Sequence, residues 1–390
     1  MPDGGRGVGA GAAWLAVVAA WAVALPAWAS PLSLRVGLLE GVGSTTLAAS
    51  VEASVQDGTG REVARLAPVE GWSASASQGA IQLRGPRGQS LRLAAGARIV
   101  PAASVATPLV FAGNRWYRGT LELRTGKGGL VVVNRVDLEA YLYGVVPSEM
   151  SANWPEAALR CQAVAARSYA LANLGKHGKA GFDICDTDEC QVYKGAGREA
   201  LASNLAVEAT RAMVLMQGGR VLPAFFHASS GGYTENSEDV WVQRLDHIRA
   251  VPDYDQNSPH YTWYKNVDAS HLASRLANRG VRVGGLRDIQ AVSRSYSGRV
   301  REVRVVGTSG TRTISGETLR IAAGLNSTLF NLAPRGGSSG LPAEFAFAGR
   351  GWGHGLGMSQ WGARRLAEAG YAFSQILAHY YPGSSLERLP

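Results

Sequence analysis

Charged residues are scarce in this sequence: they make up 18% of its 390 residues, whereas apolar residues make up 46%. That balance excludes an intrinsically disordered chain, which needs more charge and fewer apolar residues. Long uncharged apolar stretches are limited to one, at the N-terminus, which excludes a polytopic membrane protein. The 49 glycines lack the three-residue period of collagen, and their frequency predicts many turns and short strands.

The apolar stretch covers residues 7–29 and follows a short head that carries Arg6. It ends with small residues at Ala27 and Ala29, a pattern that suits cleavage by signal peptidase after Ala29. The alternative is an uncleaved N-terminal anchor, because the stretch is nearly long enough to span a bilayer. We favour a signal peptide at residues 1–29. Both alternatives predict an exported protein of the periplasm or cell envelope.

The formal net charge of +9 is unevenly distributed along the chain. Residues 30–135 carry a net charge of +6, residues 136–270 of −6 and residues 271–390 of +9. Nucleic-acid binders gather Lys and Arg with aromatic residues on one face, whereas these arginines are scattered, so we expect no nucleic-acid partner. An anionic polymer of the cell envelope suits the two basic flanks. The alternative is a solvated Arg-rich surface without a partner.

The patterning predicts an α+β protein. Residues 30–120 alternate short apolar/polar runs with Gly and Pro, which is typical of a small antiparallel β module with an accessory role. A hairpin signal with its turn at residues 125–129 opens a larger mixed α+β catalytic domain, residues 121–390. Capping and periodicity predict helices over residues 154–173, 198–212, 268–278 and 363–369, a hairpin turning at residues 218–219, and strands between residues 289 and 314.

Glu149 is the most informative carboxylate of the sequence. Val145, Val146, Pro147 and Met150 surround it along the chain. Apolar surroundings disfavour the ionised form, which is how a glutamic acid stays protonated for use as a general acid near neutral pH. The alternative interpretation is a carboxylate that caps the start of the helix expected to follow.

Glycines surround His354 in the segment of residues 351–362. The segment lacks the Lys-Ser/Thr ending of a phosphate-binding loop and belongs to no evident βαβ unit, so we expect no nucleotide. Its glycines allow the backbone to approach a ligand or a neighbouring strand closely. His354 is interpreted either as a ligand-facing residue or as a hydrogen-bonded structural histidine.

Two of the three cysteines, Cys185 and Cys190, lie close together, and Cys161 is left over. In an exported protein such a pair forms a disulfide or contributes to a metal site. Zinc needs further ligands, and His177 or nearby Asp and Glu residues are the local candidates. We rank a disulfide or plain structural pair first, zinc second, and a cysteine nucleophile with a distant histidine third.

Six segments carry a resemblance that no single motif would carry. They are LEAYLYGVVPSEM (138–150), WPEAALRCQAVAARSYA (154–170), CQVYKG (190–195), FHASSGG (226–232), GWGHGLGMSQWGA (351–363) and HYYPG (379–383). In this order they resemble the stage II sporulation protein D/LytB (SpoIID/LytB) family of bacterial cell-wall proteins, over roughly residues 130–385. The N-terminal β region matches only loosely.

The resemblance implies a peptidoglycan lytic transglycosylase, a carbon–oxygen lyase that cleaves the β-1,4 bond after N-acetylmuramic acid and prefers strands without stem peptides. The position that matches the family's catalytic glutamate is Glu149. Ordinary glycosidases use two carboxylates. A lytic enzyme uses the sugar's own 6-hydroxyl as nucleophile, so one Glu serves first as acid and then as base, and a 1,6-anhydro end results.

The resemblance also implies a set of supporting residues. Those expected to contact the glycan are Gln191, Tyr193, Ser229, Ser230, His354 and Gln360. Arg167 is expected to support the site through an ion pair. Some relatives are thought to carry zinc near Cys185 and Cys190, but Glu189 stands where a further His is expected, so we expect no cofactor and leave zinc as the alternative.

A non-catalytic role is the rival interpretation, because LytB-type relatives have been described as enhancers of a separate cell-wall amidase. The protein would then bind glycan strands without cutting them, and an amidase would be its partner. A cysteine peptidase is the third interpretation and predicts loss of activity on thiol alkylation.

Overall fold

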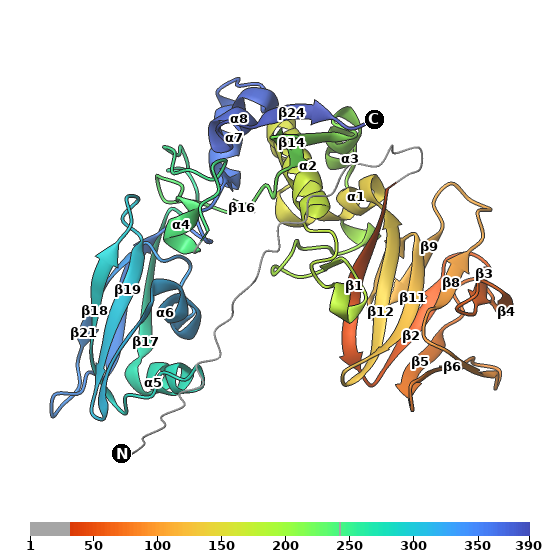
Figure 1. The fold of residues 1–390 in the computed structure, drawn as a ribbon, viewed down its shortest axis with the longest axis horizontal. Helices are drawn as coiled ribbons and strands as arrows, with labels where there is room; N and C mark the ends of the chain where they lie inside the picture. The colour runs from red at the N-terminus through yellow and green to blue at the C-terminus, as the bar shows by residue number, and fades with distance from the viewer. Residues whose placement is uncertain (1–31, 242) are drawn as a thin grey trace, which may run out of the picture. The chain divides into compact units, whose positions relative to one another are not determined.

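The computed structural model describes residues 32–241 and 243–390, so the predicted signal peptide at residues 1–29 lies outside the described residues. The chain forms two compact units (Figure 1). The larger unit comprises residues 32–226, Asp246–Arg249 and Gly357–Pro390, and the smaller unit comprises His227–Leu245 and Ala250–Leu356. Both helices and strands are abundant, and most sheets are antiparallel, which confirms the predicted α+β class.

Two sheets form the β region of the larger unit. The seven-stranded sheet has the order β13-β1-β12-β11-β8-β3-β4, in which only β13 runs parallel to its neighbour. Its strands are β1 (Ser33–Val42), β3 (Ala53–Gln56), β4 (Glu62–Leu66), β8 (Ala97–Pro101), β11 (Thr120–Gly126), β12 (Gly129–Asp137) and β13 (Ile184–Cys185). The six-stranded sheet has the order β10-β9-β2-β5-β6-β7. Its strands are β2 (Ser44–Ala49), β5 (Trp72–Ser77), β6 (Ala80–Arg84), β7 (Ser90–Leu93), β9 (Leu109–Ala112) and β10 (Arg115–Arg118).

One hydrophobic core joins these strands to the first helices. Leu34 of β1, Trp72 of β5 and Leu123 of β11 are buried in the same cluster as Leu142 and Leu159. The alternating apolar positions of the strands supply this cluster, because one face of each sheet is turned inward. The β region and the helical region of the larger unit therefore share one core.

The predicted division at residue 120 falls inside the seven-stranded sheet. Strand β11 begins at that point and pairs with β8 on one side and with β12 on the other, while β12 also pairs with β1. The predicted hairpin is present, since β11 and β12 pair down to Gly126 and Gly129. Backbone pairing between distant strands thus places residues 32–120 and the following region in the same compact unit.

The larger unit also contains helices. They are α1 (Leu138–Glu149), α2 (Glu156–Ala172), α3 (Leu201–Ala209), α7 (Gln360–Glu368) and α8 (Phe373–Tyr380), with 3₁₀ turns η1 (Gly178–Ala180) and η2 (Ala196–Arg198). A small sheet has the order β15-β14-β24, with β14 (Met213–Gln217), β15 (Arg220–Val221) and β24 (Ser385–Arg388). Short strands β16 (Phe226–His227) and β23 (Met358–Ser359) lie where the chain passes between the units.

The smaller unit contains two three-stranded sheets, β17-β22-β21 and β18-β19-β20. Their strands are β17 (Thr262–Asp268), β18 (Leu286–Arg294), β19 (Val300–Gly307), β20 (Gly310–Ser315), β21 (Phe330–Arg335) and β22 (Glu344–Arg350). Its helices are α4 (Ser237–Val240), α5 (Ala269–Ala277) and α6 (Gly316–Ala323). Leu272 of α5 and Leu319 of α6 pack with Val303 and Phe345 in a core separate from that of the larger unit.

Most predicted elements are present, with shifted ends. Helix α7 begins at Gln360, earlier than predicted, because the Ser359 side chain accepts a hydrogen bond from the Gly362 N–H and caps the helix. Asp268 caps α5 in the same way. No helix among the described residues is long and apolar enough to cross a membrane.

A buried ion pair joins the helices of the larger unit. Arg167 on α2 is fully buried and donates to both carboxylate oxygens of Glu139 on α1, at 2.9 and 2.6 Å. It also donates to the carbonyl oxygens of Val207 at 3.3 Å and Met213 at 3.0 Å, and Glu139 accepts the Ala212 N–H at 3.1 Å. Every polar partner of this arginine therefore comes from a different part of the unit.

Replacing Arg167 by methionine leaves Glu139 buried without its counter-charge. We expect Arg167→Met to lower the free energy of unfolding by about 3–5 kcal/mol, measured by urea denaturation. The matched control is Arg160→Met on the same helix, because Arg160 pairs with Glu156 at the surface and should cost less than about 1 kcal/mol. Equal losses in the two variants would show that the buried pair has no special role.

Candidate functional site

Glu149 is the last residue of α1, and this position determines its surroundings. The helix begins at Leu138 and is capped by Asp137, whose carboxylate accepts the N–H groups of Glu139 and Ala140. Helix α2 begins only at Glu156, and its cap residue is Pro155. The alternative interpretation of Glu149 as a cap for the following helix is therefore wrong. At the C-terminal end of a helix the macrodipole disfavours a negative charge, so this position favours the protonated carboxyl group.

The Glu149 carboxyl group is partly buried and held by two neighbours. Its Oε1 accepts the backbone N–H of Val192 at 2.6 Å, and the Gln360 side chain also hydrogen-bonds the group. Burial raises the pKa of Glu149, the negative charge of Asp188 adds to the rise, and the two hydrogen bonds oppose it. The side chain keeps partial solvent exposure. The residue thus combines a raised pKa with partial contact with solvent.

Gln360 reaches Glu149 because α7 packs against α2. Its Nε2 donates to Oε1 of Gln162 at 3.3 Å, and both side chains are buried. Trp154, just before α2, meets Trp361 edge-on at 5.0 Å, and the Arg364 guanidinium lies over both rings. Gln162 was not predicted. It lies in a helix whose small residues gave no sign that a polar side chain points inward.

Gln191 and Tyr193 lie on the segment that carries Val192, and both are buried. The Gln191 Nε2 donates to the carbonyl oxygen of Ala166 at 3.3 Å. The Tyr193 hydroxyl donates to Oδ1 of Asn134 at 3.1 Å, and burial raises the pKa of Tyr193. In this structure both side chains hold the segment in place instead of facing solvent.

A glycine in α1 makes room for the Tyr193 ring. A Cβ atom on Gly144 would lie 2.6 Å from that ring. The ring also packs against Tyr141 at 4.8 Å and Tyr117 at 5.4 Å. This aromatic packing joins α1 to the segment of Val192, so it helps to set the hydrogen bond on Glu149.

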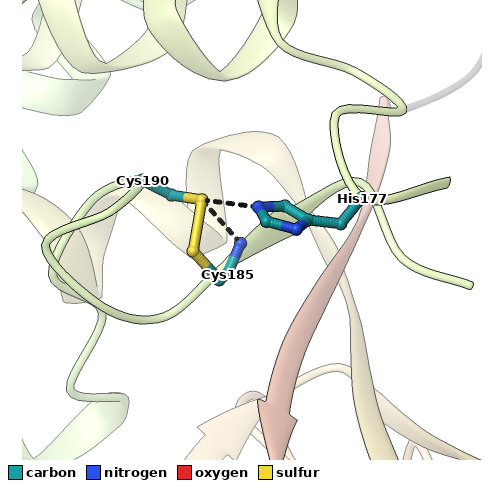
Figure 2. A group of neighbouring side chains, drawn as sticks. All are labelled: His177, Cys185 and Cys190. Atoms are coloured by element: carbon teal, nitrogen blue, oxygen red, sulfur yellow. Dashed lines mark hydrogen bonds between the residues drawn. A yellow bond between two sulfur atoms is a disulfide. The ribbon is translucent and has the colours of Figure 1, made fainter. Parts of the chain in front are cut away.

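Cys185 and Cys190 form a disulfide, and His177 lies beside it (Figure 2). The Nε2 of His177 is 3.3 Å from Sγ of Cys190, and the Cys185 N–H donates to the same sulfur at 3.0 Å (Figure 2). Burial lowers the pKa of His177 and so favours the neutral imidazole. Glu189 lies at 3.7 Å from the same nitrogen.

The donor set at this cluster suits zinc only in its reduced form. The ligand atoms of His177, Cys185 and Cys190 lie within 4.8 Å of one another. Zinc binds cysteine as the thiolate, so the disulfide and a zinc ion are mutually exclusive uses of the same two sulfurs. Cys161 lies apart from this cluster, and burial raises its pKa, which argues against a reactive thiol.

Ser229 and Ser230 belong to the smaller unit, and both are fully buried. Their hydroxyls donate to the carboxylates of Asp255 and Asp253 respectively. The Gly231 N–H donates to Asp255 at 2.8 Å. These contacts hold the loop in shape, so in this structure the two hydroxyls are used within the protein.

His354 lies in the smaller unit and is partly exposed. Its Nδ1 accepts the Leu356 N–H at 2.9 Å, and its ring is 5.5 Å from the ring of His227. The glycine at position 353 is required here, because a Cβ atom would lie 2.7 Å from His227 and the residue has φ of +113°. The structure therefore shows His354 with a local structural bond and an exposed edge.

Arg299 is a further buried cation that the sequence did not reveal. It donates to the Ser230 carbonyl oxygen at 2.7 Å, and burial lowers its pKa to about 10. A Cβ atom on Gly355 would lie 2.6 Å from its Nε, and Gly355 has φ of +86°. The contact between Arg299 and Gly355 is visible only in the folded structure, where the glycine-rich loop packs over the guanidinium. The two residues are far apart in the sequence.

The predicted residues therefore fall into two groups. The group in the larger unit consists of Glu149, Gln191, Tyr193, Gln360 and Arg167. Within it, Gln360 contacts Glu149 directly, and the others support the surroundings of Glu149. Ser229, Ser230 and His354 lie in the smaller unit. The chemistry that Glu149 offers in the larger unit is proton transfer by a carboxyl group with a raised pKa.

Comparisons with known proteins agree with the six segments found in the sequence. A family model described as Stage II sporulation protein (SpoIID) matches residues 126–217, and a model described as Domain of unknown function (DUF8618) matches residues 234–357. The first covers α1, α2 and the disulfide segment, and the second covers most of the smaller unit.

Full-length relatives show the same likeness. Stage II sporulation protein D of Bacillus subtilis is 30% identical over 270 residues, which are 65% of this chain and 75% of the relative. An uncharacterized protein of Brachyspira hyodysenteriae is 31% identical over 68% of this chain and 71% of its own length. The amidase enhancer of Bacillus subtilis is 30% identical over 63% of this chain but only 40% of its own length. The resemblance is thereby confirmed, and the chain belongs to the stage II sporulation protein D (SpoIID) family.

Proposed function

We propose that this protein is an exported lytic transglycosylase that cleaves the β-1,4 bond after N-acetylmuramic acid in peptide-free peptidoglycan strands. One observation carries the proposal: burial raises the pKa of the Glu149 carboxyl group, although the residue keeps partial solvent exposure. A general acid needs a carboxyl group that is still protonated near the working pH. Family membership supports a role at the cell wall.

The mechanism uses Glu149 twice. Its proton passes to the glycosidic oxygen while the bond from that oxygen to C1 of muramic acid breaks. The resulting carboxylate then accepts the proton of the 6-hydroxyl group, whose oxygen forms a bond to C1. The strand ends in a 1,6-anhydro ring, Glu149 regains its proton, and no water is consumed. The Val192 N–H stabilises the carboxylate between the two steps.

Replacing Glu149 by glutamine removes the transferable proton and retains the shape of the side chain. We expect Glu149→Gln to reduce turnover of peptide-free glycan by about 100- to 10,000-fold, scored by mass spectrometry of the products. Wild-type protein should release anhydro-muramyl ends, with or without a chelator, because the proposed steps need no metal.

The matched control is Glu156→Gln, because Glu156 is an exposed carboxylate in the first turn of α2. It should leave turnover unchanged. Hydrated reducing ends from the wild type would identify a hydrolase and contradict the lytic mechanism. Undiminished turnover in Glu149→Gln would remove Glu149 from the catalytic role.

The raised pKa of Glu149 also predicts how stability changes with pH. The folded protein binds this proton more tightly than the unfolded chain, so stability falls as pH rises from the ordinary Glu pKa of 4.5 through the folded value. Glutamine cannot ionise. The melting temperature of Glu149→Gln should therefore exceed that of the wild type by a margin that grows from about pH 4 to about pH 7.

Asp186 must be separated from this effect, because burial raises its pKa to about 6. Asp186→Asn should remove the part of the pH dependence that ends near that value, and the part due to Glu149 should persist. A margin for Glu149→Gln that is constant with pH would show that the Glu149 pKa is not raised.

The second candidate is a binding protein that enhances a cell-wall amidase, and the likeness to an amidase enhancer favours it. A pull-down on purified cell wall, run beside the product assay, separates the two functions. Binding of the wild type without anhydro products, together with faster glycan-strand stripping by added amidase, would support the enhancer. Anhydro products from the protein alone would support the lyase.

A further inference from the structure

The outer face of the β17-β22-β21 sheet contains a pocket of about 290 Å³. Its walls include Thr262 and Tyr264 of β17, Asn331 of β21 and Arg350 of β22, and Ala348 lies between them. The opposite face of the same sheet carries the core residues of the smaller unit. The pocket therefore lies on the solvent side of a sheet that the core fixes from behind.

The pattern of side-chain sizes produces this hollow. Across the three strands, Tyr264 pairs with Ala348 and Ala348 pairs with Asn331, so the smallest side chain has larger neighbours on both sides. Gly349 next to it cannot carry a side chain, because a Cβ atom would lie 2.2 Å from the Trp263 ring. Gly349 therefore lets the Trp263 ring pack on the core face, while the small Ala348 side chain leaves the hollow on the solvent face.

Positive charge without a carboxylate partner distinguishes the pocket. Arg294 and Arg350 both line it, and no Asp or Glu does. Arg294 donates to the carbonyl oxygens of Gly298 at 2.8 Å and Phe330 at 3.0 Å and to Oδ1 of Asn331 at 3.0 Å. These neutral oxygens orient the guanidinium without cancelling its charge.

Arg350 is the second arginine of the pocket. It pairs across the sheet with Thr262, and its Cζ lies 6.0 Å from the ring centroid of Tyr261. Within the part of the chain that the structure describes, neither pocket arginine forms an ion pair. Two guanidinium groups in one pocket, of which that of Arg294 is held by hydrogen bonds, favour a carboxylate ligand, because a guanidinium binds a carboxylate through paired N–H donors.

The remaining groups suit a sugar ring. The Tyr264 side chain is 83% exposed, so its ring offers a flat apolar face to the C–H groups of a pyranose. The Asn331 amide and the Thr262 hydroxyl offer hydrogen bonds to hydroxyl or acetamido groups. The volume is at the lower end of the range for small-ligand pockets, which suits one sugar residue.

We propose that this pocket binds the carboxylate-bearing sugar of a peptide-free peptidoglycan strand, N-acetylmuramic acid with its lactyl carboxylate free. The identity of the ligand rests on the proposed function, whereas the preference for a sugar carboxylate rests on the pocket itself. In an intact strand the stem peptide converts this carboxylate into an amide. The smaller unit, which matches a domain of unknown function, thereby selects strands from which the peptide has been removed.

The test measures binding by calorimetry with the full chain carrying Glu149→Gln, so that no ligand is consumed. Three glycan oligosaccharides of equal length are compared: peptide-free, peptide-free with amidated carboxylates, and peptide-bearing. We expect the peptide-free ligand to bind about tenfold more tightly than the other two. Added Arg350→Gln should abolish that preference. Added Tyr264→Ala should weaken binding of all three.

The control is Arg304→Gln, because Arg304 is an exposed arginine on β19 outside the pocket, and it should change nothing. Equal affinity for the peptide-free and amidated ligands, or an unchanged preference in Arg350→Gln, would overturn the inference. Tighter binding of the peptide-bearing ligand would assign the carboxylate to the stem peptide and also overturn it. The binding measurement does not depend on cleavage. If the wild-type protein released no anhydro products, that result would contradict the proposed reaction and leave the inference about the pocket unaffected.

Discussion

The buried ion pair between Arg167 and Glu139 is the interaction on which the candidate site depends. It joins α2 to α1, and its further bonds reach the carbonyl oxygens of Val207 and Met213. Because Glu149 is the last residue of α1, the orientation of that helix decides where the catalytic candidate lies. A charge pair in the interior is costly to break, since each partner would be left desolvated and unpaired. The helices that carry the site therefore hold one relative arrangement.

Glu149 shows how opposing effects are balanced at such a site. Burial and a neighbouring aspartate favour the protonated group, and its place at the end of a helix acts in the same sense. The Val192 N–H and the Gln360 side chain favour the ionised group. A carboxyl group that must donate a proton and then accept one needs both influences, because either state alone would be too stable. The cost falls on stability, as is usual where function needs a strained or desolvated group.

The two units offer different chemical groups. The larger unit carries the Glu149 carboxyl group with its raised pKa, and the smaller unit carries a pocket lined by two arginines and an exposed aromatic ring. Gly353 and Gly355 of the 351–357 loop serve the smaller unit by lying against His227 and Arg299 respectively. Their frequency in the sequence reflects close packing over buried polar groups as well as turns.

The sequence alone predicted the α+β class, the 121–134 hairpin, the long helix after Trp154 and the family, all of which are confirmed. These depend on local periodicity, turn chemistry and motif order, which neighbouring residues carry. The sequence could not show that the predicted residues Gln191, Tyr193, Ser229 and Ser230 are buried in this fold. Nor could it show that other buried residues contact the predicted ones, namely Gln162, Asp255 and Arg299. The burial and the contacts of these residues depend on the tertiary structure, because hydrogen bonds and packing join residues that lie far apart along the chain. Glu149, Val192 and Gln360 are an example.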